Sequence, residues 1–249
     1  MKSLSLLLLL ALCVTTPCYA ESPAEIVRKA DLKMRGESSY TEATMEIVRP
    51  DWTRSMSMKG WTKGTDFSLV LVTAPARDKG SSSLKRNKEM WNWIPSIERI
   101  IKVAPSMLGQ SWMGSDFTND DLINQSSIVV DYTHELLRQE DYDGVSCWVV
   151  AATPKPNAPV VWGKLQLWVS VAEYNLRQVE YYDEFDDLIN TMSNYAVEEL
   201  GGRLIPTRLE MRPADKPQQK TVMVYHAAEF DFAMEENFFS QSRMKELRQ

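Results

Sequence analysis

The sequence has few of the residues on which most catalytic and metal sites depend. It contains two histidines and three cysteines among 249 residues. Two of the cysteines, Cys13 and Cys18, lie in the first 20 residues. If these residues are removed as an export signal, only Cys147 remains. A lone cysteine forms no intramolecular disulfide, and structural zinc sites need clusters of cysteine and histidine. We therefore expect neither feature, and we expect Cys147, next to Trp148 and two valines, to be a buried thiol.

Long apolar runs are equally scarce. Residues 4–12 form one such run; it follows Lys2 and leads to Cys18-Tyr19-Ala20, the small-residue ending of an export signal. About nine residues are too few for a membrane-spanning helix of roughly 20. We therefore predict that residues 1–20 are a cleavable signal peptide and that residues 21–249 form one domain. Leu12 precedes Cys13 where lipid-modification sites take a small residue, which argues against acylation.

An excess of positive charge is also absent. The chain has 34 acidic residues against 28 basic ones, a net charge of −6. This balance disfavours nucleic acid and anionic membrane surfaces as stable partners. Basic residues are concentrated in residues 81–88, "SSSLKRNK". A solvated hairpin explains them, and the alternative is a patch that receives a phosphate or the acidic face of a partner protein.

The residue pattern predicts one helix followed by many strands. Ser22, Pro23 and Glu25 form a capping box with proline in the first turn, and apolar residues recur at helical spacing until Gly36. From Tyr40 the period changes to two, and short alternating segments follow one another to residue 230. Residues 236–248 indicate a short terminal helix. The prediction is a mainly β (α+β) fold with about eleven antiparallel strands in a sheet that must curl, close or be covered.

The sequence offers little support for a catalytic serine nucleophile. Residues 109–113, "GQSWM", lack the second glycine of a nucleophile elbow. The two candidate bases, His134 and His226, lie in strand patterns and are expected to be surface or edge residues. We therefore predict that the protein is not an enzyme, with a hydrolase as the least favoured alternative.

The acidic residues at 116–121 do not form a recognisable metal site. A calcium loop would require a glycine and a distal glutamate that this segment lacks. Helix capping explains the segment better, with Ser115 or Asp116 as the N-cap and Asp120 and Asp121 either in the first turn or capping a second short helix. We accordingly predict no metal and no cofactor.

Large and flexible side chains are concentrated in the first half of the predicted sheet and in the segment that follows it. Several methionines and tryptophans recur on successive strands between residues 56 and 113. Methionine specifies a packed core poorly but adapts to a ligand without fixed shape. An ordinary core is the alternative explanation for each of these residues taken singly.

Three segments resemble a known family. They are "AEIVRKADLKMRG" at residues 24–36, "SMLGQSWMGSDFTNDDL" at residues 106–122 and "ENFFSQSRMKELR" at residues 236–248. Together they make residues 22–248 similar to the outer-membrane lipoprotein-sorting proteins of the LolA-like superfamily. The resemblance implies an unclosed, strongly curved antiparallel β-barrel, with an N-terminal helix and mid-chain helices that cover its concave apolar face. It also implies a periplasmic location.

The function implied by this resemblance is a periplasmic carrier for lipoprotein acyl chains or a related lipid, transported toward the outer membrane. The alternative is a periplasmic lipid-sensing regulator or an accessory subunit of an envelope transporter. An inner-membrane transporter is a candidate partner, and contact with membrane surfaces is expected to be transient. Residues 107–117 would form a lid over the mouth of the half-barrel. The predicted ligand-binding residues of pocket and lid are Met45, Ile47, Met56, Met58, Leu69, Leu71, Trp91, Trp93, Met107, Leu108, Trp112, Met113 and Phe117.

Overall fold

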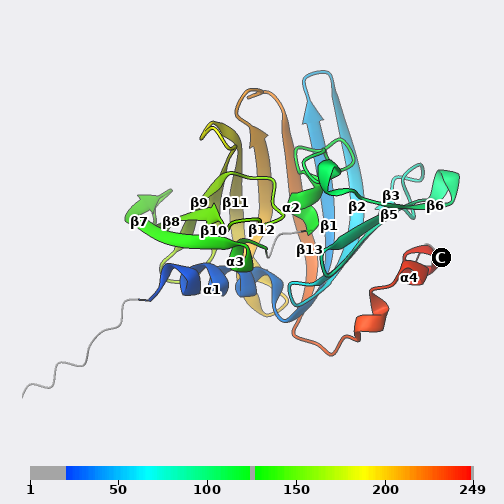
Figure 1. Cartoon of the computed structure of the whole chain (residues 1–249), viewed down its shortest axis with the longest axis horizontal. Coiled ribbons are helices and arrows are strands. Elements are labelled where there is room, and N and C mark those ends of the chain that lie inside the picture. Colours follow the sequence, from blue (N-terminus) through cyan, green and yellow to red (C-terminus); the bar gives the residue numbers. More distant parts are fainter. Residues whose placement is uncertain (1–20, 124–126, 248–249) are drawn as a thin grey trace, which may run out of the picture.

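A single antiparallel sheet dominates the computed structural model, which describes residues 21–123 and 127–247 (Figure 1). The predicted signal peptide and Cys13 therefore lie outside the described residues. The thirteen strands are β1 (Ser38–Arg49), β2 (Trp52–Lys63), β3 (Phe67–Ala74), β4 (Ser82–Arg86), β5 (Glu89–Ile94), β6 (Arg99–Lys102), β7 (Tyr132–Tyr142), β8 (Val145–Pro154), β9 (Lys164–Ser170), β10 (Leu176–Tyr182), β11 (Leu188–Leu200), β12 (Arg203–Pro213) and β13 (Lys220–Phe230). Their number exceeds the predicted count of about eleven.

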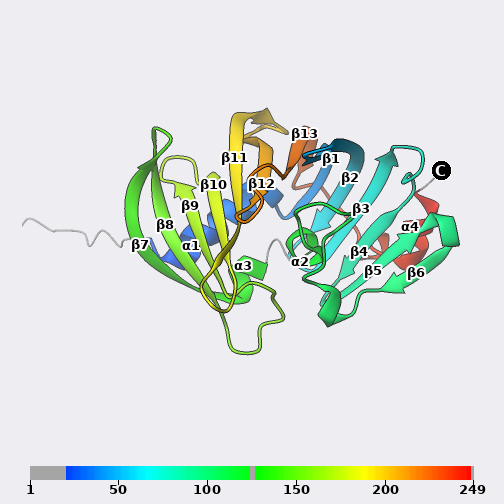
Figure 2. The same cartoon turned by 90° about the horizontal axis from the view of Figure 1, so that it is seen from above.

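The sheet consists of two meanders joined at their long central strands. Its order is β6-β5-β4-β3-β2-β1-β13-β12-β11-β10-β9-β8-β7, so β1 and β13 pair across the junction and β6 and β7 are the two edges. Because the edge strands do not pair with each other, the sheet stays open. Seen from above, it curves around one side of the molecule (Figure 2). The predicted unclosed, curved antiparallel architecture is confirmed.

Helix α1 (Pro23–Arg35) crosses the concave side and has the predicted ends. The Ser22 hydroxyl accepts a hydrogen bond from the Glu25 amide at 3.2 Å, and Pro23 lies in the first turn. Gly36 ends the helix with a φ of 67°, and its amide donates to the Leu32 carbonyl. A Cβ at Gly36 would lie 2.7 Å from Asp231 Oδ1, so both conformation and space favour glycine there.

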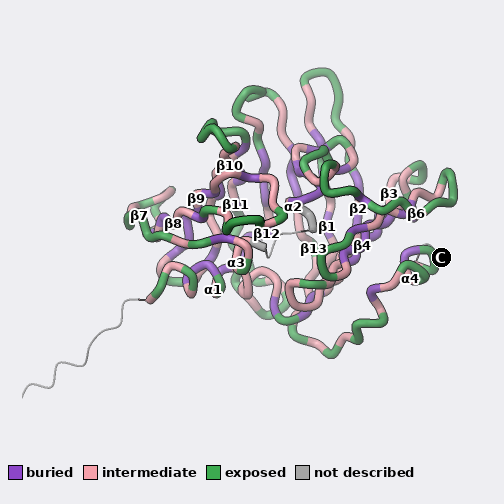
Figure 3. The backbone as a smooth tube through the Cα atoms, in the orientation of Figure 1, coloured by how far each residue is buried: buried purple, intermediate pink, exposed green. Residues whose placement is uncertain are grey.

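Two apolar clusters occupy opposite faces of the sheet. The main core lies on the concave face beneath α1. Figure 3 marks the buried residues of the chain in purple. The second cluster lies on the outer face of β2–β5, where Leu69 and Leu84 are cross-strand neighbours. The C-terminal segment covers it with Phe239 and Met244. Both faces of β2–β5 are therefore buried.

The C-terminal segment differs in detail from the single predicted helix. It contains a 3-10 turn (Glu236–Phe238) and then α4 (Gln241–Glu246). Ser240 separates the two, because its hydroxyl accepts from the Arg243 amide and starts α4 as an N-cap. The break lets Phe239 insert into the outer cluster while α4 lies along β4 and β5.

The basic segment at residues 81–88 is not a solvated hairpin. The Lys85 side chain is buried and donates from Nζ to the Thr65 carbonyl at 2.8 Å. Arg86 donates from Nη1 to the Phe239 carbonyl at 3.1 Å. These two side chains thus hold neighbouring backbone segments together, which leaves little of the expected positive patch.

Within the described ranges, no helix is long and apolar enough to span a membrane.

Candidate functional site

A cavity of about 210 Å³ lies between α1 and the concave face of the second half of the sheet. This is far more than the space that one water molecule occupies. Most of its wall is apolar. The apolar lining comprises Val27, Ala30, Met34, Phe117, Ile128, Leu165, Leu167, Val169, Leu176, Val179, Met192, Leu200, Ile205, Leu209, Met223, Ala228 and Phe230.

The strand register explains why these side chains converge. Leu167 pairs with Val179 between β9 and β10, and Val179 pairs with Met192 between β10 and β11. Leu209 of β12 pairs in turn with Met223 of β13. Because alternate residues of a strand face the same side, these pairs form an apolar band that runs across five strands.

Helix α1 closes one side of the cavity and is held in place at both ends. Near the start of the helix, the Tyr174 hydroxyl in the turn between β9 and β10 donates to Glu21 Oε2 at 2.8 Å, and Lys29 pairs with the same carboxyl group at 2.6 Å. At the other end, the Arg203 guanidinium donates to the carbonyls of Leu32 and Lys33 at 2.8 and 3.0 Å. A cation at the helix C-terminus also complements the helix dipole. The helix is therefore a fixed wall of the cavity.

The described parts of the next segment, residues 117–123 and 127–132, close a second side. Phe117 and Tyr132 line the cavity from either end of this segment, around the short helix α2 (Asn119–Ile123). Thr118 is the capping residue: the Asp121 amide donates to its hydroxyl at 3.1 Å, and its own amide donates to Asp121 Oδ2 at 2.8 Å. The predicted cap at Ser115 or Asp116 is therefore wrong, although Asp121 does lie in the first turn as expected.

Asp121 also places a carboxyl group in the cavity wall. Its Oδ1 accepts a hydrogen bond from Trp162 Nε1 at 2.8 Å, and the Trp162 ring packs on Tyr181 with centroids 5.1 Å apart. Burial raises the pKa of Asp121 to about 6, against the opposing effect of its hydrogen bonds. This end of the cavity is consequently polar and aromatic.

Asn194 is a second polar group in the wall. It is 4% exposed and pairs with Leu209 on the neighbouring strand. Its Nδ2 donates to the Leu176 carbonyl at 2.7 Å. No described residue donates to its Oδ1.

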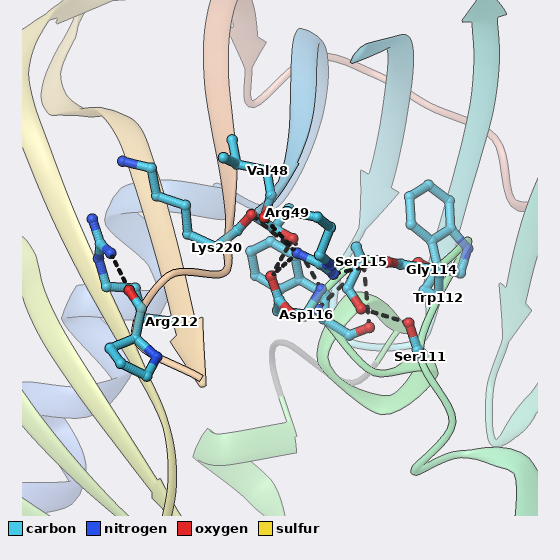
Figure 4. A network of polar contacts seen from close by, with 12 residues as sticks. Val48, Arg49, Ser111, Trp112, Gly114, Ser115, Asp116, Arg212 and Lys220 are labelled. Atoms are coloured by element: carbon cyan, nitrogen blue, oxygen red, sulfur yellow. Dashed lines mark hydrogen bonds and ion pairs between the residues drawn. The ribbon is translucent and has the colours of Figure 1, made fainter. Parts of the chain in front are cut away.

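Polar contacts of Gly114 and Asp116 fix the segment around Trp112 to the sheet (Figure 4). Arg49 forms an ion pair with Asp116 at 3.0 Å and donates from Nη2 to the Gly114 carbonyl at 3.0 Å. The Asp116 amide donates to Thr221 Oγ1 at 2.9 Å. Strands β1 and β13 thereby hold the segment in place.

Comparison with known proteins agrees with this architecture. A family model described as "Uncharacterized protein" matches residues 64–246. The chain belongs to this family. A comparison with curated proteins gave no significant match.

Solved structures show the same fold over almost the whole chain. A DUF1329 family protein from Desulfovibrio piger has a TM-score of 0.79 at 24% identity, covering 88% of this chain and 95% of its own. A domain from Vibrio parahaemolyticus, named as an outer membrane lipoprotein-sorting protein, has a TM-score of 0.79 at 19% identity, covering 90% and 98%. A LolA superfamily protein from Nitrosomonas europaea has a TM-score of 0.77 at 24% identity, covering 90% and 100%. The fold is therefore LolA-like.

The thirteen predicted ligand-binding residues do not converge on one place. Phe117 alone among them lines the cavity. Six others lie in or against the main core beside it: Met45, Ile47, Met56, Met58, Trp112 and Met113. The methionines of β1 and β2 pair directly across the strands, Met45 with Met56, and so fill the space that a ligand would need.

The remaining predicted residues lie farther from the cavity. Leu69, Trp91 and Trp93 belong to the outer cluster under the C-terminal segment. Leu71 is buried and pairs with Ser82, whose hydroxyl donates to the Met244 carbonyl on that same outer face. Met107 and Leu108 pack in a small separate cluster. Ligand contact by these residues stays a prediction.

Cys147 and the two histidines singled out from the sequence lie outside the cavity. Cys147 is buried, as expected, and burial raises the pKa of its thiol to about 11. His134 lies on the edge strand β7 with Nε2 2.8 Å from the Ile128 carbonyl oxygen, and His226 is exposed. Neither histidine lines the cavity, and no group of three metal-binding side chains occurs within residues 21–123 and 127–247.

The residues that do line the cavity carry few signals in the sequence. Leu167, Val179 and Leu209 are ordinary strand residues whose alternation predicts only an inward face. Asp121 was explained by helix capping, which is correct but incomplete, since the same carboxyl group lines the cavity. Asn190 and Asn194 both interrupt the apolar alternation of β11, so alternation alone does not distinguish the one that lines the cavity.

Proposed function

We propose that the protein is a periplasmic carrier that binds the acyl chains of a lipoprotein or a related lipid in the cavity beneath α1. The observation that carries the proposal is the apolar band across β9–β13, closed by a fixed helix. Each buried methylene contributes about 0.8 kcal/mol, so an acyl chain can bind there without any charge pairing. The predicted signal peptide and the name of the Vibrio parahaemolyticus domain support the location and the cargo class.

The chemistry of the wall suits binding better than catalysis. The described lining includes the Ser39 hydroxyl but no histidine, so this hydroxyl has no imidazole base beside it. Asp121 is engaged by Trp162 and by the Thr118 amide, which position it within the wall. Binding and release of an apolar ligand require none of these groups to react.

A blocked cavity tests where the ligand binds. Met192 lies in the middle of the apolar band, and Met192→Trp would place an indole in the cavity. The expected result is that a fluorescent acyl probe binds the variant at least about tenfold more weakly than the wild type, a loss of roughly 1.4 kcal/mol. Val197→Trp, an exposed site on the same strand, is the matched control and should bind like the wild type.

Thermal unfolding of the same samples makes the result interpretable. Overpacking costs typically 1–3 kcal/mol, so Met192→Trp should remain folded with a reduced melting temperature. A folded Met192→Trp protein that binds the probe as tightly as the wild type would show that the cavity is not the binding site.

A transfer assay separates a carrier from a lipid-sensing regulator. Donor vesicles containing the fluorescent acyl probe are mixed with unlabelled acceptor vesicles, and the appearance of the probe in the acceptor is followed over time. A carrier speeds this exchange in proportion to its concentration, and Met192→Trp should not. Probe binding without any acceleration would favour the regulator.

A further inference from the structure

Asn194 occupies an unusual place in the cavity. It lies in the apolar band between β10 and β12, beside Leu176 and opposite Leu209 in the strand register. Its neighbour two residues away in the cavity wall, Met192, carries no strong hydrogen-bonding side chain. An asparagine with 4% exposure therefore interrupts a wall that would otherwise be continuous and apolar here.

The orientation of its amide is determined by one contact. The β10–β11 ladder begins at Gln178 and Ser193, so the Leu176 carbonyl lies beyond the ladder and accepts from Asn194 Nδ2 at 2.7 Å instead. Rotating the amide by half a turn would set Oδ1 against that carbonyl oxygen, two acceptors facing each other. Oδ1 therefore stays on the side of the amide away from that carbonyl, in a residue that lines the cavity.

The amide oxygen is left as an acceptor without a donor among the described residues. Buried polar atoms are rarely unpaired in folded proteins, because they lose their hydrogen bonds to water. In an apolar setting such an acceptor suits a neutral donor. A carboxylate would be repelled by it, and an ammonium group would lose its hydration without gaining a counter-charge.

We propose that Asn194 determines ligand specificity: its Oδ1 accepts a hydrogen bond from a hydroxyl group carried on the acyl chain of the ligand. This inference rests on the proposed function, since it assigns a chemical class to the lipid that the cavity holds. The cavity then prefers hydroxylated acyl chains to plain ones. One position of the hydroxyl along the chain matches the position of Asn194, and other positions gain nothing.

Competition against a fluorescent acyl probe tests the inference. The competitors are myristate, a series of hydroxymyristates with the hydroxyl at successive carbons, and the methoxy derivative of the best isomer. We expect one isomer to bind the wild type about tenfold more tightly than myristate, the factor expected for one net hydrogen bond. The methoxy derivative fills the same space but cannot donate, so it should lose this advantage.

Two variants on β11 complete the test. Asn194→Leu should bind every competitor about equally, and Asn190→Leu should keep the wild-type preference. Asn190 is a matched control because it is a buried asparagine on the same strand that does not line the cavity. The methoxy comparison needs only the wild type. If Asn194→Leu fails to fold, it still tests whether the ligand must donate a hydrogen bond.

The outcomes distinguish this inference from the proposed function. If the wild type binds myristate and all hydroxymyristates equally, or if the preference survives in Asn194→Leu, the proposed role of Asn194 is wrong. The proposed carrier function is unaffected by that result. If the wild type binds neither the probe nor any competitor, the proposed function fails, and this inference fails with it.

Discussion

Trp112 Nε1 donates a hydrogen bond to Ser83 Oγ at 3.1 Å, and Ser83 Oγ donates in turn to Asn92 Oδ1 at 2.7 Å. This chain of contacts joins the mid-chain segment to β4 and β5. Trp112 is 3% exposed and belongs to the main core. It therefore acts as a fixed anchor of the segment, beside the cavity but outside its lining.

Trp112→Ala should destabilise the protein more than it weakens ligand binding. Removal of a buried tryptophan typically costs about 3–5 kcal/mol, and loss of the hydrogen bond that Ser83 accepts adds to it. Urea denaturation measures the free energy of unfolding, and probe titration measures the affinity of the folded fraction. Trp52→Ala, at a site 51% exposed, is the control and should change neither. A stable Trp112→Ala protein with strongly reduced affinity would instead support the predicted lid.

The ion pair between Arg49 and Asp116 should contribute measurably to stability. The two side chains are 12% and 6% exposed, so loss of one partner leaves a largely buried charge, which typically costs about 3–5 kcal/mol. A double-mutant cycle with Arg49→Ala and Asp116→Ala measures the coupling free energy. The exposed pair Arg138–Glu140 is the control, with an expected coupling below about 1 kcal/mol. Equal coupling in both pairs would show that the Arg49–Asp116 ion pair does not hold the segment.

The C-terminal segment should depend on Phe239. This side chain is fully buried in the outer cluster, and Phe239→Ala should lower the free energy of unfolding by about 3–5 kcal/mol. Phe185→Ala removes the same group at a site 77% exposed and should have almost no effect. Limited proteolysis provides the second readout, because the segment after residue 231 should become cleavable in Phe239→Ala alone. Resistance to cleavage in that variant would mean that other contacts hold the segment.

Asp121 should make stability fall as the pH rises. Its folded pKa of about 6 lies above the ordinary value of 3.8, so the folded state holds the proton more tightly than the unfolded state. The unfolded state therefore binds fewer protons between about pH 4 and pH 6, and the free energy of unfolding decreases with pH across that window. The contribution lost amounts to at most about 3 kcal/mol.

Asp121→Asn removes this titration while keeping the shape of the side chain. Urea denaturation of both proteins from pH 4 to pH 7 should show the wild type losing stability relative to the variant as the pH rises. A difference in unfolding free energy that is constant over this range would show that Asp121 has an ordinary pKa in the folded protein.

The local features of the fold could be predicted from the sequence because local rules determine them. Ser22 and Gly36 bound α1 as expected, since capping depends on a few neighbouring residues. Alternation correctly placed most strands. It did not predict the break at Ser240 in the C-terminal segment, where burial of Phe239 against distant strands outweighs local helix propensity.

The position of the cavity could not be predicted in the same way. Alternation indicates that Met56 and Leu167 both face inward, but it does not indicate which inward face is filled. That depends on the curvature of the sheet and on where α1 crosses it, both set by contacts between distant residues. The methionines pack against one another and fill the core, while plain aliphatic residues beneath α1 line the space that remains.

The central claim is that an acyl chain occupies the cavity beneath α1, and photocrosslinking tests it most directly. A fatty acid with a diazirine on its chain is bound, irradiated and located by peptide mass spectrometry. We predict labelling of the cavity strands at residues 165–179, 192–209 and 223–230, suppressed by excess unlabelled fatty acid and by Met192→Trp. Competed labelling confined to residues 45–58, 91–93 or 107–113, or labelling that excess fatty acid does not suppress, would contradict the account.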